Sequence, residues 1–368
     1  MVIQFFLGKG NDHRHNFLLI VRLDAIGDYL LFRNFISSLI ESDKYKGKHV
    51  TLVGNLAWKS LALELDSEFV DEFIWIDRKK FVHNYWYRYR KLKQITANGY
   101  ETVVSSVFSR EFFHADWVVR AANAKNKIGS AGDCSNMTPR QKTISDAWFT
   151  ELMPVRDGVL FEFYRNREFF ENLLDKKIAL AQPTINYVGQ QKKFNLSKKY
   201  AVLFIGASAS YRKWPIESFA ATARQLSGCY GYDIVLCGGA EDTGFVSDFS
   251  MSFNDEFVDQ VGKTSLVDMM SILSGASILV SNETSIPHFA VALGLQEVVV
   301  IYNGAHFGRF VPYPERMTQS YHVIYHPEMQ KNKGDYMETS DRYEKRENLD
   351  ISRISVDTVA SKIIEIMA

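Results

Sequence analysis

The sequence predicts an α/β fold made of two Rossmann-like, doubly wound domains that face a central cleft. Three observations lead to this prediction. Short apolar runs alternate with longer stretches of helical periodicity, which is typical of parallel sheets flanked by helices. The pattern starts afresh near residue 200, after a stretch without periodicity. The chain has 368 residues, which is longer than a single hydrophobic core usually serves.

Four apolar runs in the first half of the chain predict strands. They are FLLIVR at 17–22, HVTLVG at 49–54, EFIWI at 72–76 and ETVVSS at 101–106. Apolar residues at helical spacing predict helices near 28–41, 56–65, 82–97, 110–122 and 158–175. We therefore expect a first domain over residues 1–185. A linker is expected over 186–199, where periodicity is lost and a basic cluster occurs.

The second half repeats this design. Strands are expected for YAVLFI at 200–205, YDIVLC at 232–237, SILVS at 277–281 and EVVVIY at 297–302, with helices near 215–227, 241–252, 265–274 and 286–294. These elements predict a second domain over 200–350, in which the polar segment 327–350 is a surface excursion. Apolar residues at helical spacing predict a last helix at 355–367 within 351–368, and the first domain is one surface on which it could pack.

The composition excludes several classes of protein. Lys and Arg together number 43, as do Asp and Glu, so no global field favours a nucleic-acid partner. No run reaches the ~18 apolar residues that a membrane span needs, and the N-terminus turns polar too quickly for a signal peptide. Three scattered cysteines favour neither a disulfide framework nor a zinc site. We therefore expect a cytoplasmic protein.

The first polar loop at a strand end is RLDAIGD, at 22–28. Gly27 allows backbone to approach a ligand closely. Asp28 lies where the next helix begins, and the positive end of the helix dipole favours its ionised form there. This placement suits a general base at the edge of a cleft. The alternative is that Asp24 or Asp28 only caps the helix.

The corresponding loop of the second half is GASASYRKWP, at 206–215. Backbone N–H groups, the hydroxyls of Ser208 and Ser210, and the charges of Arg212 and Lys213 would suit a diphosphate. A solvated loop is an equally good interpretation. The chain lacks the motif GxxxxGK[ST], so a Walker loop is excluded. It also lacks GxGxxG, so a classical dinucleotide site, and with it a dehydrogenase, has weak support.

Two further loops follow strands of the second half. In GGAED, at 238–242, Glu241 could accept hydrogen bonds from ribose or sugar hydroxyls, or the acids could simply start a helix. In SNETSIPH, at 281–288, Thr284 or Ser285 can cap the helix, and its free N–H groups form an anion site. Capping does not account for Glu283 and His288, although a structural role for His288 stays open.

A basic and aromatic segment, RKKFVHNYWYRYRKLKQ at 78–94, belongs to the first half. It could hold a phosphorylated glycolipid at a membrane face. The alternative is a solvated helix whose basic side chains cover its aromatic rings.

Taken together, these motifs resemble glycosyltransferase family 9, the heptosyltransferases of lipopolysaccharide core assembly. The likeness spans roughly 17–310 and rests on RLDAIGD, GASASYRKWP, GGAED and NETSIPH, in the family's order and spacing. The resemblance implies the GT-B fold, with the family's catalytic aspartate at Asp28. The expected donor site consists of Ser208, Ser210, Arg212, Lys213, Glu241, Glu283, Thr284, Ser285 and His288, and the expected acceptor side of Arg22, Gly27 and Arg110. Arg212, Glu283 and Ser285 stand where the family usually has Lys, Asp and Gly, and the departures at Glu283 and Ser285 put the donor sugar in doubt.

The implied activity is an inverting transfer of heptose or a related sugar from a nucleotide-diphosphate donor. ADP-heptose is one such donor, and the acceptor would be a lipopolysaccharide-type glycolipid or an oligosaccharide. No cofactor or metal is expected to be obligatory, and contact with the cytoplasmic face of the inner membrane is expected to be peripheral. The alternatives are a sugar-nucleotide epimerase or hydrolase of the same fold, and a degenerate, non-catalytic glycan-binding relative.

Overall fold

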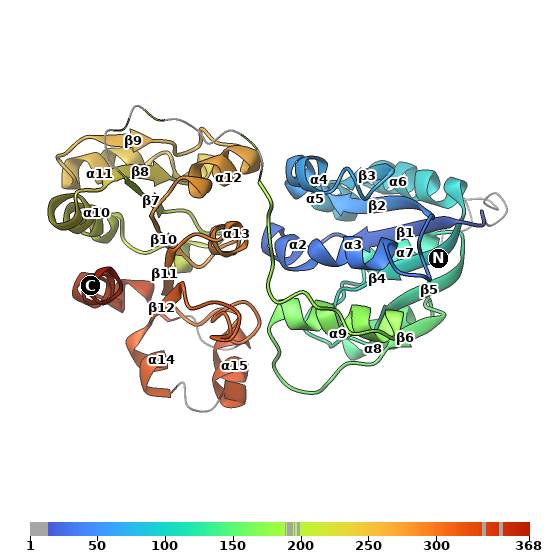
Figure 1. Cartoon of the computed structure of the whole chain (residues 1–368). Helices are drawn as coiled ribbons and strands as arrows, with labels where there is room; N and C mark the ends of the chain where they lie inside the picture. The colour runs from blue at the N-terminus through green and yellow to red at the C-terminus, as the bar shows by residue number, and fades with distance from the viewer. Residues whose placement is uncertain are drawn as a thin grey trace. The chain divides into compact units, whose positions relative to one another are not determined.

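The structure is a computed structural model that describes residues 14–187, 189, 194, 196, 199–332, 336–345 and 349–368 (Figure 1). The first 13 residues and most of the expected linker 186–199 lie outside the described residues. The chain divides into two compact units: unit 1 is Met1–Asp157 with Glu162–Leu180, and unit 2 is Gly158–Phe161 with Ala181–Ala368. Each unit contains a parallel sheet and flanking helices, so the predicted α/β class is confirmed.

Unit 1 is built on a six-stranded parallel sheet. Its strands are β1 (Phe17–Arg22), β2 (His49–Asn55), β3 (Glu72–Ile76), β4 (Tyr100–Ser105), β5 (Ala124–Ser130) and β6 (Glu151–Met153). The order β3-β2-β1-β4-β5-β6 is that of the Rossmann fold. The direction of winding reverses between β1 and β4, where Leu19 is in register with Val103. The sequence predicted four of these strands, and β5 and β6 were missed.

Helices cover both faces of this sheet (Figure 1). On one face lie α5 (Arg78–His83), α6 (Tyr85–Asn98) and α7 (Ala115–Ala121), whose Phe81, Leu92 and Val118 share a core with β1. On the other lie α2 (Ile26–Phe32), α3 (Asn34–Ile40) and α9 (Glu162–Leu174). Phe35 of α3 stacks on Phe170 of α9, with ring centroids 5.4 Å apart. The unit also contains η1 (Leu56–Trp58), α4 (Lys59–Leu65) and α8 (Pro139–Asp146).

Unit 2 contains a second six-stranded parallel sheet. Its strands are β7 (Tyr200–Phe204), β8 (Asp233–Cys237), β9 (Phe257–Asp259), β10 (Ile278–Asn282), β11 (Glu297–Tyr302) and β12 (Tyr321–Tyr325). The order β12-β11-β10-β7-β8-β9 repeats the Rossmann order, with the reversal between β7 and β10. The sequence did not predict β9 or β12.

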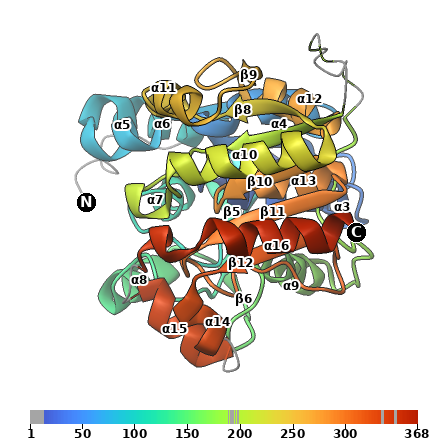
Figure 2. The same cartoon turned by 90° about the vertical axis from the view of Figure 1, so that its left-hand side faces the viewer.

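The helices of unit 2 also lie on both faces of their sheet. On one face are α10 (Ile216–Tyr230), α11 (Phe245–Ser252) and α16 (Val356–Met367); on the other are α12 (Leu266–Ser274) and α13 (Ile286–Leu293) (Figure 1). Short turns η2 (Ser210–Arg212), η3 (Ala240–Asp242) and η4 (Ile351–Arg353) complete the unit, with α14 (Pro327–Asn332) and α15 (Tyr336–Lys345). Figure 2 shows α16 lying beside α10.

The C-terminal part is built into unit 2. Val359 and Ile363 of α16 are fully buried in the core of unit 2 with Phe219 of α10, so the apolar face of the last helix packs there and not, as the sequence left open, on the first domain. The segment 327–350 is more than a surface excursion. Its α14 and α15 bury Met329 and Tyr343 in a small core with aromatic residues from β11 and the loop after it.

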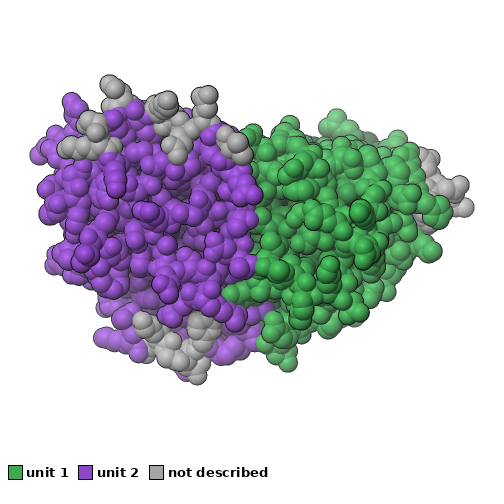
Figure 3. Space-filling model, viewed as in Figure 1, with its two compact units in different colours: residues 1–157, 162–180 green, residues 158–161, 181–368 purple. Residues whose placement is uncertain are grey.

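Figure 3 colours the two units, each of which has its own hydrophobic core. Among the described residues, no helix combines the length and apolarity that crossing a bilayer would require.

Candidate active site

The strand order places the candidate residues at one defined point of each sheet. In doubly wound sheets, ligands bind outside the carboxyl ends of the strands, where the winding reverses. In unit 1 this point lies between β1, which ends at Arg22, and β4, which ends at Ser105. In unit 2 it lies between β7, followed by residues 206–212, and β10, followed by Glu283. The loops singled out from sequence therefore occupy both reversal points.

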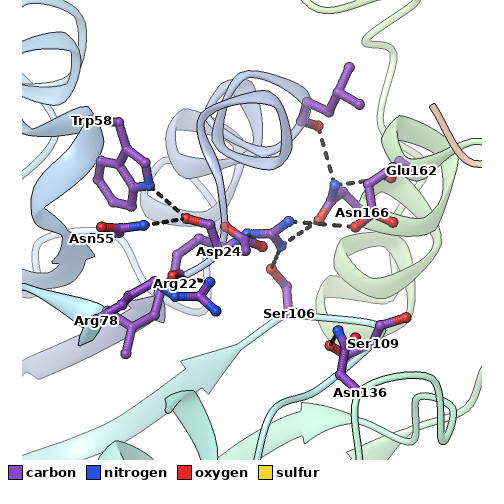
Figure 4. A network of polar contacts seen from close by, with 12 residues as sticks. Arg22, Asp24, Asn55, Trp58, Arg78, Ser106, Ser109, Asn136, Glu162 and Asn166 are labelled. Carbon is purple, nitrogen blue, oxygen red and sulfur yellow. Dashed lines mark hydrogen bonds and ion pairs between the residues drawn. The ribbon is translucent and has the colours of Figure 1, made fainter. Parts of the chain in front are cut away.

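Arg22 is the centre of a buried polar network in unit 1 (Figure 4). Its Nε lies 2.6 Å from Oδ2 of Asp24, and its Nη2 lies 3.5 Å from Oε1 of Glu162. Its Nη1 donates to Oγ of Ser106 at 3.1 Å and to Oδ1 of Asn166 at 2.9 Å. The network therefore joins the end of β1 to the loop after β4 and to α9.

The backbone of the loop after β1 is held by three further side chains. The carbonyl oxygen of Asp24 accepts hydrogen bonds from Nδ2 of Asn55 at 2.9 Å and Nε1 of Trp58 at 3.2 Å. The carbonyl oxygen of Leu23 accepts one from Nη1 of Arg78 at 2.8 Å. These bonds fix the direction in which the chain enters α2.

Asp28 is the third residue of α2, one position after Gly27. The residue that caps the helix is Ala25, and no side chain forms a capping hydrogen bond there. Capping by Asp24 or Asp28, the alternative left open from the sequence, is therefore not what the structure shows. Asp28 is half-buried in the first turn, where the helix dipole favours a carboxylate.

Burial and the neighbouring charges shift the pKa values of Arg22 and Asp24. Burial, together with the Asp28 and Glu162 carboxylates, outweighs the opposing effect of the Arg22 guanidinium and raises the pKa of Asp24 to about 8. Burial disfavours the charged form of Arg22, but Asp24, Glu162 and Asp28 outweigh this effect and raise its pKa. Arg22 therefore stays a cation. Repulsion from the Asp28 and Glu162 carboxylates therefore favours the protonated form of Asp24.

The structure does not support direct acceptor contact by Arg22 or Arg110. Both side chains are 0% exposed. Arg110 is engaged by Asp146 and Ser145, and its Nε lies 3.7 Å from Oδ2 of Asp116. Because their charged groups are used inside unit 1, these arginines hold the loops after β1 and β4 in place.

Arg212 is the central cation of the candidate site in unit 2. It is 8% exposed on η2, and its Nη1 lies 2.9 Å from Oε2 of Glu283 and donates to Oγ of Ser208 at 3.3 Å. Burial raises the pKa of Glu283, and Arg212 lowers it. This ion pair joins the loop after β7 to the loop after β10, so two of the predicted donor residues meet at the reversal point.

Lys213 does not join the ion pair of Arg212 with Glu283; it forms an ion pair with the fully buried Asp242 instead. Oδ2 of Asp242 also accepts from the backbone N–H of Gly239 at 2.8 Å. A Cβ at Gly206 would lie 2.5 Å from that same oxygen, so glycine is required for the close approach. Lys213 thus ties the loop after β7 to the loop after β8, where Glu241 is exposed on η3.

Asn282 fixes the loops of unit 2 from the end of β10, and sequence analysis gave it no role. It is fully buried, and its Nδ2 donates to the carbonyl oxygen of Ile205 at 2.8 Å. Its Oδ1 accepts from the backbone N–H of Trp214 at 3.0 Å. The asparagine therefore clamps both ends of the segment that carries Ser208, Ser210 and Arg212.

At the start of α13, Ser285 is the capping residue by position, without a side-chain hydrogen bond. Oγ1 of Thr284 accepts from the backbone N–H of Ile286 at 3.2 Å. His288, in the first turn, is 3% exposed, and its Nδ1 lies 2.8 Å from the hydroxyl of Tyr313. Burial lowers the pKa of His288 to about 4, so its imidazole is neutral at neutral pH.

Helices α5 and α6 present a basic and aromatic surface on unit 1. No acidic residue occurs between Arg78 and Asn98. Tyr85 is 46% and Trp86 is 68% exposed, and Lys79, Lys80, Arg90 and Lys93 are exposed beside them in the sequence. Two other rings are covered as the alternative from sequence expected, since Lys91 lies over Tyr87 and Lys93 over Tyr89. We call the exposed residues from Lys79 to Lys93 the α5–α6 surface.

Among the residues that the structure describes, no group of three or more His, Cys, Asp or Glu side chains is arranged to hold a metal ion.

Comparison with protein families gives one match. The model described as glycosyltransferase family 9 (heptosyltransferase) matches residues 88–340. No protein with a curated description matches the sequence significantly.

Several solved structures are similar to the whole chain. A family 9 glycosyl transferase of Veillonella parvula has 16% identity and a TM-score of 0.70, covering 98% of this chain and 99% of its own. E. coli heptosyltransferase WaaC with ADP-2-deoxy-2-fluoro heptose has 18% identity and a TM-score of 0.69, over 95% and 99% of the two chains. E. coli ADP-heptose LPS heptosyltransferase II has 16% identity and a TM-score of 0.64, over 95% and 98%. At these identities the likeness concerns the fold, which is GT-B-like.

Proposed function

Because the chain belongs to glycosyltransferase family 9, we propose that it transfers a sugar from a nucleotide-diphosphate donor to a glycan or glycolipid acceptor. The observation that carries this proposal is the ion pair of Arg212 with Glu283 at the point where the sheet of unit 2 reverses. A buried guanidinium with a hydroxyl beside it suits a diphosphate, because its N–H groups match the geometry of phosphate oxygens.

The proposed donor site is arranged along the edge of the sheet in unit 2. Arg212, with Ser208, Ser210 and the N–H groups at the start of α13, would bind the diphosphate. Glu241, in the loop after β8, would accept from the ribose, and Glu283 from hydroxyls of the sugar. Thr284, Ser285 and His288 would complete the site from α13. Lys213 would act indirectly, since its ion pair with Asp242 positions the loop.

In the proposed reaction, an acceptor hydroxyl attacks the anomeric carbon and forms the new glycosidic bond. The bond from that carbon to the phosphate oxygen breaks, its electron pair leaves with the nucleoside diphosphate, and the configuration inverts. The Asp28 carboxylate takes the proton of the hydroxyl, which is worth roughly 10²–10⁴-fold in rate. Arg212 stabilises the negative charge that grows on the leaving phosphate.

The donor and acceptor are proposed more narrowly from the relatives. ADP-heptose is the first donor to test, because the WaaC structure holds ADP-2-deoxy-2-fluoro heptose. For the acceptor we propose a lipopolysaccharide-type glycolipid at the cytoplasmic face of the inner membrane. Its phosphates would meet the cations of the α5–α6 surface.

A binding measurement tests the donor site. Wild-type protein is titrated with ADP-heptose and with ADP-, UDP- and GDP-hexoses by thermal shift, and a donor at 100 times its Kd should stabilise unit 2 by about 2.7 kcal/mol. Arg212→Gln should weaken binding of the preferred donor by at least ~10-fold, because a charged hydrogen bond to phosphate is lost.

Arg212→Gln also leaves Glu283 buried without its cation, so it could destabilise the fold. The double variant Arg212→Gln/Glu283→Gln removes both charges and should fold normally while still binding the donor weakly. Arg224→Gln, on the exposed face of α10, is the matched control. Donor binding by the double variant at wild-type strength would remove Arg212 from the site, and stabilisation by no nucleotide sugar at all would contradict the proposed function.

A further inference from the structure

The loop after β11 is tied directly to the loop that carries Arg212. Asn303, 2% exposed, follows β11, and its Nδ2 donates to the carbonyl oxygen of Tyr211 at 2.8 Å. The same group donates to the carbonyl oxygen of Leu349 at 2.9 Å. Tyr211 immediately precedes Arg212, so the residues that follow Asn303 lie close to the proposed diphosphate site. Sequence analysis gave none of these residues a role.

His306 occupies an unusual backbone conformation in this loop. Its φ is 60°, in the left-handed region that few residues other than glycine adopt. The loop is anchored in a small hydrophobic core, because the neighbouring Phe307 and Val311 are 2% and 1% exposed and pack with Met329 and Tyr343. Oγ of Ser340 donates to the carbonyl oxygen of Phe307 at 2.9 Å. Strained backbone that the surroundings hold in place is frequent at ligand sites.

The imidazole of His306 is set among cations. Its Nδ1 is buried and accepts or donates no hydrogen bond within the described part of the chain. Burial, together with the positive charges of Arg212 and Arg309, lowers the pKa of His306 to about 4. Buried ring nitrogens are normally hydrogen-bonded, because leaving one unsatisfied is costly. A bound anion would give this ring nitrogen a partner, and the nearby positive charges of Arg212 and Arg309 would favour the anion.

The order of the strands indicates which part of the donor would reach His306. Along the edge of the sheet the loops follow in the order β11, β10, β7 and β8. The proposed ribose contact, Glu241, follows β8, the proposed diphosphate contact, Arg212, follows β7, and His306 follows β11. A donor whose nucleoside lies at the loop after β8 would therefore point its second phosphate toward the loop after β11.

We propose that His306 binds the second, sugar-bearing phosphate of the nucleotide sugar and thereby extends the donor site to the loop after β11. This inference rests on the proposed function, since it deepens the description of the same site. The proposed interaction is a hydrogen bond from the imidazole to an oxygen of the second phosphate. A nucleoside monophosphate lacks this phosphate.

Calorimetric titration with matched nucleotides tests this inference. The probes are ADP, UDP, GDP and CDP, of which the one bound most tightly by wild type is then compared with its monophosphate. His306→Asn removes the imidazole but keeps a residue that tolerates the left-handed conformation, and His306→Gly removes the side chain and any backbone strain. Both variants should raise the Kd of the diphosphate at least ~10-fold and leave that of the monophosphate unchanged.

The other outcomes overturn the inference in distinguishable ways. Equal loss of affinity for both nucleotides would assign His306 a purely structural role. Unchanged affinity for the diphosphate in both variants would exclude His306 from the site while leaving the proposed function intact. If wild type bound none of the four diphosphates, the proposed function would fail together with the inference. His15→Asn, at an exposed histidine before β1, is the control and should bind like wild type.

Discussion

Arg22 shows how a single residue can determine the geometry of a candidate site without meeting the ligand. The sequence places Arg22 at the end of a strand, and we expected its positive charge to contact the acceptor. In the structure its guanidinium is fully buried between Asp24 and Glu162 and above the ring of Phe32, 4.7 Å from its centroid. Its partners Glu162 and Asn166 lie about 140 positions further along the chain. No local pattern predicts such a contact.

Removing this cation should destabilise unit 1. Arg22→Met leaves two buried carboxyl groups without their partner, so we expect the free energy of unfolding of unit 1 to fall by about 3–5 kcal/mol. Arg22→Met/Asp24→Asn should recover part of that loss, since one of the carboxyl groups is removed with the cation. Urea unfolding measures both, with the exposed Arg140→Met as control. A loss by Arg22→Met no larger than that of the control would contradict this description.

His288 should make the stability of unit 2 depend on pH. Its pKa falls from 6.5 to about 4 on burial, so between these values the unfolded state binds more protons than the folded state. The contribution of His288 is complete above pH 6.5 and is lost as the pH falls toward 4, by about 3 kcal/mol in total. His288→Phe should flatten the fall of stability over this interval in urea unfolding followed at several pH values. The same slope in wild type and variant would show that His288 is not buried as described.

At the scale of elements, the surface of α5 and α6 is the feature with the clearest external consequence. Phe81, Leu92 and Ile95 face the core, while Tyr85, Trp86 and several Lys and Arg residues face outward. Exposed aromatic rings combined with basic side chains are typical of helices that rest on anionic lipid. The absence of acidic residues from Arg78 to Asn98 adds to this local positive charge in a chain of zero net charge.

Vesicle sedimentation tests this surface. We expect the protein to pellet with vesicles that contain phosphatidylglycerol but not with vesicles of pure phosphatidylcholine. Salt should release it from the vesicles, because the attraction is electrostatic. Trp86→Ser and Arg90→Gln/Lys93→Gln should each weaken binding. Arg140→Gln, at an exposed position of α8, is the control. Equal binding by all variants would assign the contact to another surface.

The elements that sequence analysis missed have physical reasons for escaping it. β5 reads AKNKIGS, a polar strand with a glycine, yet it pairs with both β4 and β6. Lys127 fits there because its amine reaches the carbonyl oxygen of Arg120 at 3.1 Å, and Gly129 makes room for the ring of Phe149. β12, in contrast, reads YHVIY and carried a detectable strand signal in its aromatic and β-branched residues.

At the scale of the whole molecule, the repeated strand order explains why the sequence predicted as much as it did. Both sheets have the Rossmann order, so the polar loops after β1, β7 and β10 necessarily lie at the points of reversal. Hydrophobic periodicity and turn residues suffice to find those loops. The side-chain contacts between them do not follow from local pattern. Arg212 with Glu283 and Asn303 with Tyr211 join residues 71 and 92 positions apart, which only the tertiary structure brings together.

The most direct test of sugar transfer is the release of nucleoside diphosphate from the preferred nucleotide sugar, with and without a glycolipid or oligosaccharide acceptor. We predict release only when an acceptor is present, and a rate lower by ~10²–10⁴-fold in Asp28→Asn, whose donor affinity should equal that of wild type. The exposed Asp43→Asn should turn over normally. Release that needs no acceptor would instead identify a hydrolase or epimerase, and undiminished turnover by Asp28→Asn would contradict the assignment of the catalytic base.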